Sequence, residues 1–182
     1  MLILASGSPR RKELLSLITD EFEVLVSGCD EFVPEGTPAE KVPAILAEQK
    51  ALAVAKLRPE DTVIGSDTVV VLGGEIFGKP KDKEHAHAML KALSGKKHFV
   101  YTGVAVAEND KVRSFVQKTE VEFYELSDEI IEKYIATGEP MDKAGAYGIQ
   151  GKGSVLVKGI VGDYFNVMGL PVAETARFLG LI

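Results

Sequence analysis

The sequence predicts a protein in which helices accompany a mixed β-sheet, so that its fold class is α/β or α+β. Strand and helix patterns alternate through the first half of the chain. Two long strand patterns, at residues 97–107 and 112–125, follow in the second half, and the short segment between them favours antiparallel pairing. The chain has 182 residues and 46% hydrophobic content, which suits one large domain or two small ones and a sizeable core.

The first half of the chain contains strand patterns separated by well-signalled helices. We expect strands at residues 2–5, 22–27, 62–72 and 75–77, and helices at residues 9–18, 38–57 and 82–93. Ser8 is a suitable N-cap for the first helix, and Pro9 fits its first position. Thr37-Pro38-Ala39-Glu40 offers the second helix a capping box, and Pro43 bends only its first turns. Gly73-Gly74 predicts a hairpin turn.

The second half begins with the two long strands, which are joined by Glu108-Asn109-Asp110-Lys111. We expect a helix at residues 127–136, a glycine-rich irregular segment at 138–153, a strand at about 154–161 and a final helix at 170–180. Ser127 is the expected N-cap of the first of these helices.

The overall charge and composition exclude several classes of protein. The net charge of −6 and the pI of about 5.2 argue against binding to nucleic acid, whose affinity depends on neutralising phosphates. The single cysteine, Cys29, rules out an internal disulfide and fits a reducing compartment. No stretch approaches the length of a membrane span, and the short apolar start lacks the basic region of a signal peptide. We therefore expect a cytoplasmic protein that does not bind membranes.

The most informative stretch lies between the first strand and the first helix and reads Ala5-Ser6-Gly7-Ser8-Pro9-Arg10-Arg11-Lys12. Three cations occupy the first helical turn, where the helix dipole favours anions, and no Asp or Glu precedes Glu13. A bound anion would resolve this conflict. Free backbone N–H groups, the hydroxyls of Ser6 and Ser8 and the guanidinium groups of Arg10 and Arg11 could together cradle a phosphate. The alternative is a solvated basic helix start.

Three charged side chains break the apolar pattern that surrounds them. Asp67 interrupts an apolar strand, so it needs a cation, a metal or hydrogen-bond donors unless it lies exposed beside Gly65. Lys50 leans towards the buried side of the second helix, from which it either extends to solvent or reaches an anion in a cleft. Lys79, between Gly78 and a proline, is either a ligand-binding residue or a surface lysine. Thr68 is expected on the opposite strand face from Asp67.

Two further segments carry candidate ligands. Asp30 and Glu31 follow a strand pattern and could bind a hard cation through their oxygens. The glycine-rich segment at residues 142–151 indicates backbone that passes close to a ligand, with Gln150 reading a hydrogen-bonding edge. His85 and His87 lie on different faces of one helix and make a poor metal pair. The sequence has no zinc pattern, P-loop or dinucleotide fingerprint.

These motifs together resemble the Maf-like nucleoside triphosphate pyrophosphatases. The similarity covers essentially the whole chain and includes Leu2-Ile3-Leu4-Ala5-Ser6-Gly7-Ser8-Pro9-Arg10-Arg11, Gly65-Ser66-Asp67-Thr68-Val69, Gly78-Lys79-Pro80, residues 139–151 and Gly162-Asp163-Tyr164-Phe165-Asn166-Val167-Met168-Gly169-Leu170-Pro171. The resemblance implies a single domain over residues 1–182, built as an α/β fold with an elongated mixed sheet and two lobes around a nucleotide-binding cleft.

The resemblance also implies an activity, namely metal-dependent hydrolysis of a nucleoside triphosphate to the monophosphate and pyrophosphate. Asp67 matches the proton acceptor of the family. Arg10, Thr68 and Gln150 match its substrate-discriminating positions, in the combination of the subfamily that acts on dTTP and UTP. Family members are associated with nucleotide-pool housekeeping and with arrest of septum formation.

We interpret the remaining candidates within this reaction. Ser6, Ser8, Arg10 and Arg11 would hold the triphosphate, while Lys50 and Lys79 would stabilise the leaving pyrophosphate. A Mg²⁺ or Mn²⁺ ion would bind Glu31 or Asp67 together with phosphate oxygens.

Three other interpretations remain as alternatives. They are a non-catalytic nucleotide-binding regulator of septum formation, a nucleic-acid-binding protein, and a pyrophosphatase for inosine or xanthosine triphosphate. The expected partner is the nucleotide substrate, with a homodimer as one alternative assembly.

Overall fold

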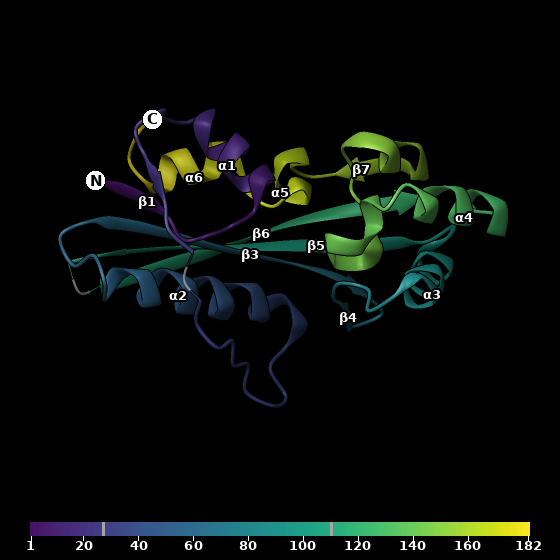
Figure 1. Ribbon diagram of the computed structural model, residues 1–182, viewed down its shortest axis with the longest axis horizontal. Helices are drawn as coiled ribbons and strands as arrows, with labels where there is room; N and C mark the ends of the chain where they lie inside the picture. The colour runs from purple at the N-terminus through teal and green to yellow at the C-terminus, as the bar shows by residue number, and fades with distance from the viewer. Residues whose placement is uncertain (27, 110) are drawn as a thin grey trace.

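The computed structural model describes residues 1–26, 28–109 and 111–182, so the predicted strand end at Ser27 and the turn residue Asp110 lie outside the described residues. Within these residues, a seven-stranded mixed sheet extends along the molecule with helices on both faces (Figure 1). The order of its strands is β2-β1-β3-β5-β6-β7, and β4 pairs with β3. The predicted mixed sheet flanked by helices is therefore confirmed.

The strands differ greatly in length. They are β1 (Leu2–Leu4), β2 (Glu23–Val24), β3 (Thr62–Leu72), β4 (Glu75–Phe77), β5 (Lys97–Glu108), β6 (Lys111–Phe123) and β7 (Val157–Val161). The helices are α1 (Pro9–Ser16), α2 (Val42–Ala55), α3 (Lys83–Leu93), α4 (Asp128–Ala136), α5 (Tyr164–Met168) and α6 (Val172–Phe178). Short 3₁₀ turns cover Ala39–Lys41, Glu139–Asp142, Ala144–Ala146 and Gly151–Leu156.

The long strands β3, β5 and β6 form a continuous support for two lobes (Figure 1). In one lobe, α2 covers one face of the sheet and α1, α5 and α6 cover the other. In the second lobe, α3 and α4 pack with the far ends of the strands around a core that includes Phe123, Tyr134 and Tyr147. Because β3 is shared by both lobes, the sheet fixes the positions of the β3 side chains that lie between them.

Two glycines let α2 lie directly on the sheet. A Cβ atom at Gly65 would lie 2.1 Å from the carbonyl oxygen of Ala47, and one at Gly103 would lie 2.3 Å from the backbone of Pro43. Gly103 pairs with Asp67 in the antiparallel register of β3 and β5. The absence of side chains at these positions allows a close approach that larger residues would prevent. This approach brings α2 within reach of Asp67.

Several predicted elements begin or end elsewhere. The strand expected at residues 22–27 is assigned only over Glu23–Val24. The capping prediction at Thr37 is wrong, because its hydroxyl donates to the Pro34 carbonyl and a 3₁₀ turn precedes α2. The strand predicted from about residue 154 starts at Val157, because a 3₁₀ turn occupies the residues before it.

The predicted final helix begins later than expected, and a helical turn that precedes it was missed. Asp163 caps α5, since its side chain accepts a hydrogen bond from the Phe165 N–H at 2.8 Å. Gly169, with a φ of 117°, ends α5, and α6 starts only after Pro171. Such a short helix has too few residues to show a helical period in the sequence.

No helix in the described ranges combines the length and the apolar character that a bilayer crossing requires.

Candidate active site

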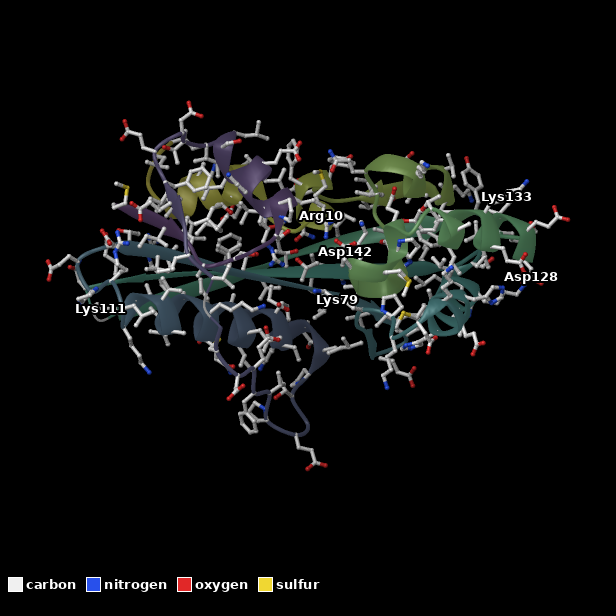
Figure 2. The ribbon with its side chains drawn as sticks, in the orientation of Figure 1. Arg10, Lys79, Lys111, Asp128, Lys133 and Asp142 are labelled. Carbon is white, nitrogen blue, oxygen red and sulfur yellow. The ribbon has the colours of Figure 1, made fainter. Side chains whose placement is uncertain are left out.

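A cleft of about 1260 Å³ separates the two lobes. Except for Asp30, the residues that the sequence nominated for binding, catalysis or metal ligation line this cleft: Ser6, Ser8, Arg10, Arg11, Glu31, Lys50, Asp67, Thr68, Lys79 and Gln150. These residues come from the turn before α1, from α1 itself, from the segment between β2 and α2, from α2, from β3 and from the loops of the second lobe. Figure 2 shows Arg10, Lys79 and Asp142 close to the middle of the molecule, where the lobes meet.

The start of α1 has the geometry that the sequence predicts. Ser8 is the N-cap, its hydroxyl accepting a long hydrogen bond from the Arg11 N–H at 3.5 Å, and Pro9 opens the helix. The first turn contains no acidic residue. Arg10 and Arg11 line the cleft at the positive end of the helix, and the first turn itself supplies no carboxylate to neutralise them.

Asp67 meets its cation across the sheet–helix interface. The Lys50 Nζ donates to Asp67 Oδ1 at 2.5 Å and lies 3.0 Å from Glu31 Oε1. The side chains of Lys50 and Asp67 are each only 14% exposed, so this pair is largely removed from solvent. Lys50 thus reaches into the cleft rather than out to solvent. Its ammonium group compensates the charge of Asp67, which would be unfavourable to bury unpaired in an apolar strand.

Arg11 is held by neutral acceptors. Its Nε donates to the Gly169 carbonyl at 2.9 Å, one Nη donates to Ser6 Oγ at 3.2 Å, and the other donates to Thr68 Oγ1 at 3.1 Å. Burial lowers the pKa of Arg11 from its ordinary value, and the nearby Asp67 partly opposes this effect. Because a guanidinium has five N–H donors, two remain for a ligand. Arg11 is fixed in position while its charge stays available.

The other cations of the cleft are arranged differently. Arg10 Nη1 lies 3.5 Å from Asp142 Oδ2, an ion pair that joins the start of α1 to the second lobe. Asp142 also pairs with Lys143 at 2.7 Å. Lys79 is exposed on the loop after β4. Among the described residues, neither Arg11 nor Lys79 forms an ion pair with a carboxylate. Both are therefore available to an anionic ligand.

The glycine-rich segment shapes the wall of the cleft that carries Gln150. Its glycines allow close approach mainly to the protein itself: a Cβ at Gly153 would lie 2.1 Å from a backbone oxygen, and one at Gly145 would contact Val70 at 2.9 Å. These contacts let the segment fold back on its neighbours to form the wall, while Gly148 and Gly151 line the cleft, and the close approach of a ligand to this backbone stays a prediction. Gln150 remains exposed at the cleft surface.

The sequence reasoning missed the residue that holds this wall, Glu139. Its carboxylate accepts hydrogen bonds from the backbone N–H groups of Lys152 and Gly153 and from the Tyr134 hydroxyl, each at 3.0 Å. Desolvation acts to raise the pKa of Glu139, but these donors outweigh it and the net direction is downward. An acidic residue before a proline carries no sequence signal of such a role, because its partners are distant in the chain.

The described side chains do not form a complete metal site by themselves. The described residues contain no cluster of three or more His, Cys, Asp or Glu side chains suited to a metal ion. Glu31 and Asp67 nevertheless direct carboxylate oxygens at one point, which Lys50 Nζ occupies. Two carboxylates complemented by phosphate oxygens form the hard-oxygen donor set that Mg²⁺ prefers. Asp30 is exposed and does not line the cleft.

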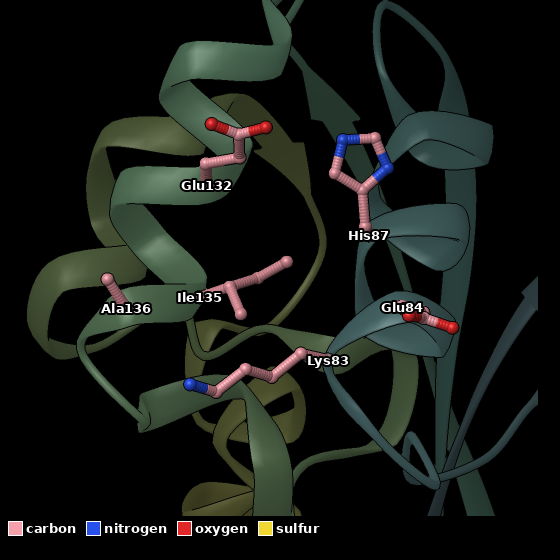
Figure 3. Close-up of a pocket in the computed structure, with 6 residues that line it drawn as sticks. All are labelled: Lys83, Glu84, His87, Glu132, Ile135 and Ala136. Carbon is pink, nitrogen blue, oxygen red and sulfur yellow. The ribbon is translucent and has the colours of Figure 1, made fainter.

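A second, smaller pocket of about 430 Å³ lies between α3 and α4 and is lined by Lys83, Glu84, His87, Glu132, Ile135 and Ala136 (Figure 3). It contains none of the residues predicted for binding or catalysis. Its polar side chains project from two helix surfaces without converging on one point in the view of Figure 3. We therefore assign the candidate active site to the cleft between the lobes.

The fold and the cleft define an α/β protein whose candidate site combines a carboxylate–lysine pair with cations suited to phosphates. The sequence pattern of the Maf-like protein family matches residues 1–181, and the chain belongs to this family. A dTTP/UTP pyrophosphatase from Bacillus cytotoxicus is 54% identical over 178 residues, which cover 97% of this chain and 93% of the relative. A dTTP/UTP pyrophosphatase from Geobacillus sp. (strain WCH70) is 54% identical over 176 residues, covering 97% and 95%.

A solved structure supports the fold independently. The HAM1 protein from Coxiella burnetii is similar with a TM-score of 0.56 at 16% sequence identity, covering 100% of this chain and 98% of that chain. At this level of identity the likeness concerns the fold alone.

Proposed function

We propose that this protein is a nucleoside triphosphate pyrophosphatase that hydrolyses dTTP and UTP to the monophosphate and pyrophosphate. The observation that carries the proposal is the placement of the Lys50–Asp67 pair in the same cleft as Arg11 and Lys79, which have no carboxylate partner among the described residues. The similarity to the dTTP/UTP pyrophosphatases supports the choice of substrate.

The triphosphate binds at the start of α1. The helix N-terminus, the hydroxyls of Ser6 and Ser8 and the guanidinium groups of Arg10 and Arg11 supply hydrogen bonds to phosphate oxygens. Lys79 adds a compact charge from the second lobe. These cations gain importance as negative charge develops on the departing pyrophosphate, which is the kind of stabilisation that lowers the barrier.

Asp67 orients the attacking water and accepts its proton. The water oxygen forms a bond to the α-phosphorus, and the bond from that phosphorus to the α–β bridging oxygen breaks, so that pyrophosphate leaves with the bridging oxygen. Lys50 holds Asp67 in place through its 2.5 Å contact. Positioning and charge stabilisation supply most of the rate enhancement in such reactions.

Gln150 reads the base. A side-chain amide offers one acceptor and two donor hydrogens, which can pair with the imide N–H and a carbonyl of thymine or uracil. Its exposed place on the cleft wall leaves both groups available to a ligand. Arg10 and Thr68 are the other proposed discriminating residues.

Glu31 and Asp67 would hold a divalent cation, Mg²⁺ or Mn²⁺, together with substrate oxygens. When bound, such an ion neutralises phosphate charge. We further propose that residues 1–182 form a single domain and that the enzyme acts in the cytoplasm on free nucleotides.

The test is a pyrophosphate-release assay with Mg²⁺ across dTTP, UTP, CTP, ITP and 7-methyl-GTP, with Asp67→Asn alongside. We expect release from dTTP and UTP, and its loss in Asp67→Asn with nucleotide binding retained. Tight nucleotide binding without release from any substrate would favour the non-catalytic regulator of septum formation. Preferential release from ITP would reassign the substrate class.

A further inference from the structure

We propose that Thr102 is a positioning residue, which fixes Thr68 as a hydrogen-bond acceptor towards the cleft and thereby holds the Arg11 guanidinium. The inference rests on the proposed function and adds a residue to its specificity apparatus. Thr102 lies on β5 directly opposite Thr68 of β3 in the antiparallel register, and it is fully buried. It does not line the cleft, so it acts only through its neighbours.

The direction of the hydrogen bonds follows from the number of hydroxyl protons. Thr102 Oγ1 lies 2.9 Å from the Asn166 carbonyl oxygen, and a carbonyl can only accept, so Thr102 donates its single proton there. Thr102 Oγ1 also lies 2.9 Å from Thr68 Oγ1. Since the Thr102 proton is already used, Thr68 must be the donor of this second bond.

These bonds determine whether the Thr68 hydroxyl donates or accepts on its cleft side. Its proton points into the core, and its oxygen accepts the Arg11 N–H at 3.1 Å. The chain of hydrogen bonds runs in one direction, from Arg11 through Thr68 and Thr102 to Asn166, and bonds aligned in this way strengthen one another. Thr68 retains one lone pair for the ligand and offers it no proton. It therefore selects a donor on the nucleotide.

The same arrangement explains a role for the motif at residues 162–171. Gly169 at the end of α5 accepts the Arg11 Nε–H, and its carbonyl also accepts from the buried Ser66 hydroxyl at 3.0 Å. Asn166, one turn earlier, terminates the Thr102 chain. The segment thus supplies two backbone carbonyls that fix Arg11, one directly and one through the two threonines.

Thr119 offers a matched control. It is a fully buried threonine on β6, and its hydroxyl bonds Asn166 Nδ2 at 2.9 Å and the Asp163 carbonyl at 2.9 Å. It therefore anchors the same segment as Thr102 without contacting Thr68. Loosening of the segment should affect Thr119→Val and Thr102→Val alike, whereas loss of the hydrogen-bond chain should affect Thr102→Val alone.

The experiment compares kcat/KM for dTTP in Thr102→Val, Thr102→Ser, Thr119→Val, Thr68→Val and the double variant Thr68→Val/Thr102→Val. We expect about a tenfold loss in Thr102→Val, values within about twofold of wild type in Thr102→Ser and Thr119→Val, and a double variant no worse than Thr68→Val, because both changes remove one chain. Equal losses in Thr102→Val and Thr119→Val, an unaffected Thr102→Val, or additive losses in the double variant would overturn the proposal.

A binding measurement separates this proposal from the proposed function. The affinity of the same variants for a non-hydrolysable dTTP analogue is measured by calorimetry, which needs no turnover. If the wild-type protein binds the analogue but releases no pyrophosphate from dTTP, the proposed hydrolysis is wrong. The affinities of the variants for the analogue, each relative to wild type, then decide the role of Thr102 by the same expected ratios. If Thr102→Val does not fold, Thr102→Ser and the comparison of Thr68→Ser with Thr68→Val provide the test. Both serine variants must retain affinity for the analogue, and a loss of affinity in either of them would overturn the proposal.

Discussion

Acid should destabilise this protein through one buried histidine, His98. Its side chain is 1% exposed on β5, where it stacks edge-on against Phe123 and Tyr147. Its Nε2 lies 2.7 Å from the Tyr147 hydroxyl, while its Nδ1 has no partner among the described residues. Burial lowers the pKa of His98 from 6.5 to about 4, because the charged imidazolium would be desolvated.

The magnitude follows from the two pKa values. Above pH 6.5 the imidazole is neutral in both the folded and the unfolded chain and contributes no pH dependence. Between pH 6.5 and 4 the unfolded chain binds a proton that the folded chain does not, so the free energy of unfolding falls as the pH falls. At about 1.4 kcal/mol per pH unit, the gap between 6.5 and about 4 corresponds to a loss of about 3 kcal/mol.

The assay is urea unfolding of the wild-type protein and of His98→Gln at pH 7, 6, 5 and 4. Glutamine can still hydrogen-bond the Tyr147 hydroxyl but does not titrate, so the variant reports the pH dependence of all the other titratable groups. We expect the stability of the wild type relative to His98→Gln to fall by about 3 kcal/mol between pH 7 and pH 4. Parallel curves for the two proteins would refute the reasoning.

Three further predictions concern the packing and charges around the cleft. Gly103→Ala should lower the free energy of unfolding by about 1–3 kcal/mol, because the added Cβ would overlap the backbone of α2 at Pro43. Urea unfolding measures the change, and Gly159→Ala is the control because a Cβ at Gly159 would meet no atom within 4 Å. Lys50→Met should reduce pyrophosphate release at least ~100-fold, whereas the exposed Lys56→Met should leave it unchanged; similar rates in the two variants would contradict the role of Lys50. Glu139→Ala should lower the free energy of unfolding by about 1–3 kcal/mol, because it leaves without an acceptor the donors that hold the wall carrying Gln150. It should also weaken selectivity for dTTP over CTP; urea unfolding and a competition assay measure the two effects. Unchanged selectivity would separate Glu139 from base reading.

The sequence by itself determined much of this protein, because the relevant signals are local. The cap at Ser8, the strand at residues 62–72 and the unneutralised cations of the first helix depend on neighbouring residues alone. Alternation along a strand likewise placed Asp67 and Thr68 on opposite faces, and the structure confirms this: Asp67 meets α2, whereas Thr68 meets Arg11.

Only the tertiary structure decided which groups are partners. Lys50 reaches Asp67 because Gly65 and Gly103 let α2 approach the sheet, and no local pattern expresses that distance. The chain of hydrogen bonds from Arg11 to Asn166 joins four elements that are far apart in sequence. Thr102 shows the difference most clearly: in the sequence it is one threonine in a strand, and its role arises from the register of β5 against β3. Hydrogen-bond direction is a property of the assembled network, so it is fixed only when the chain has folded.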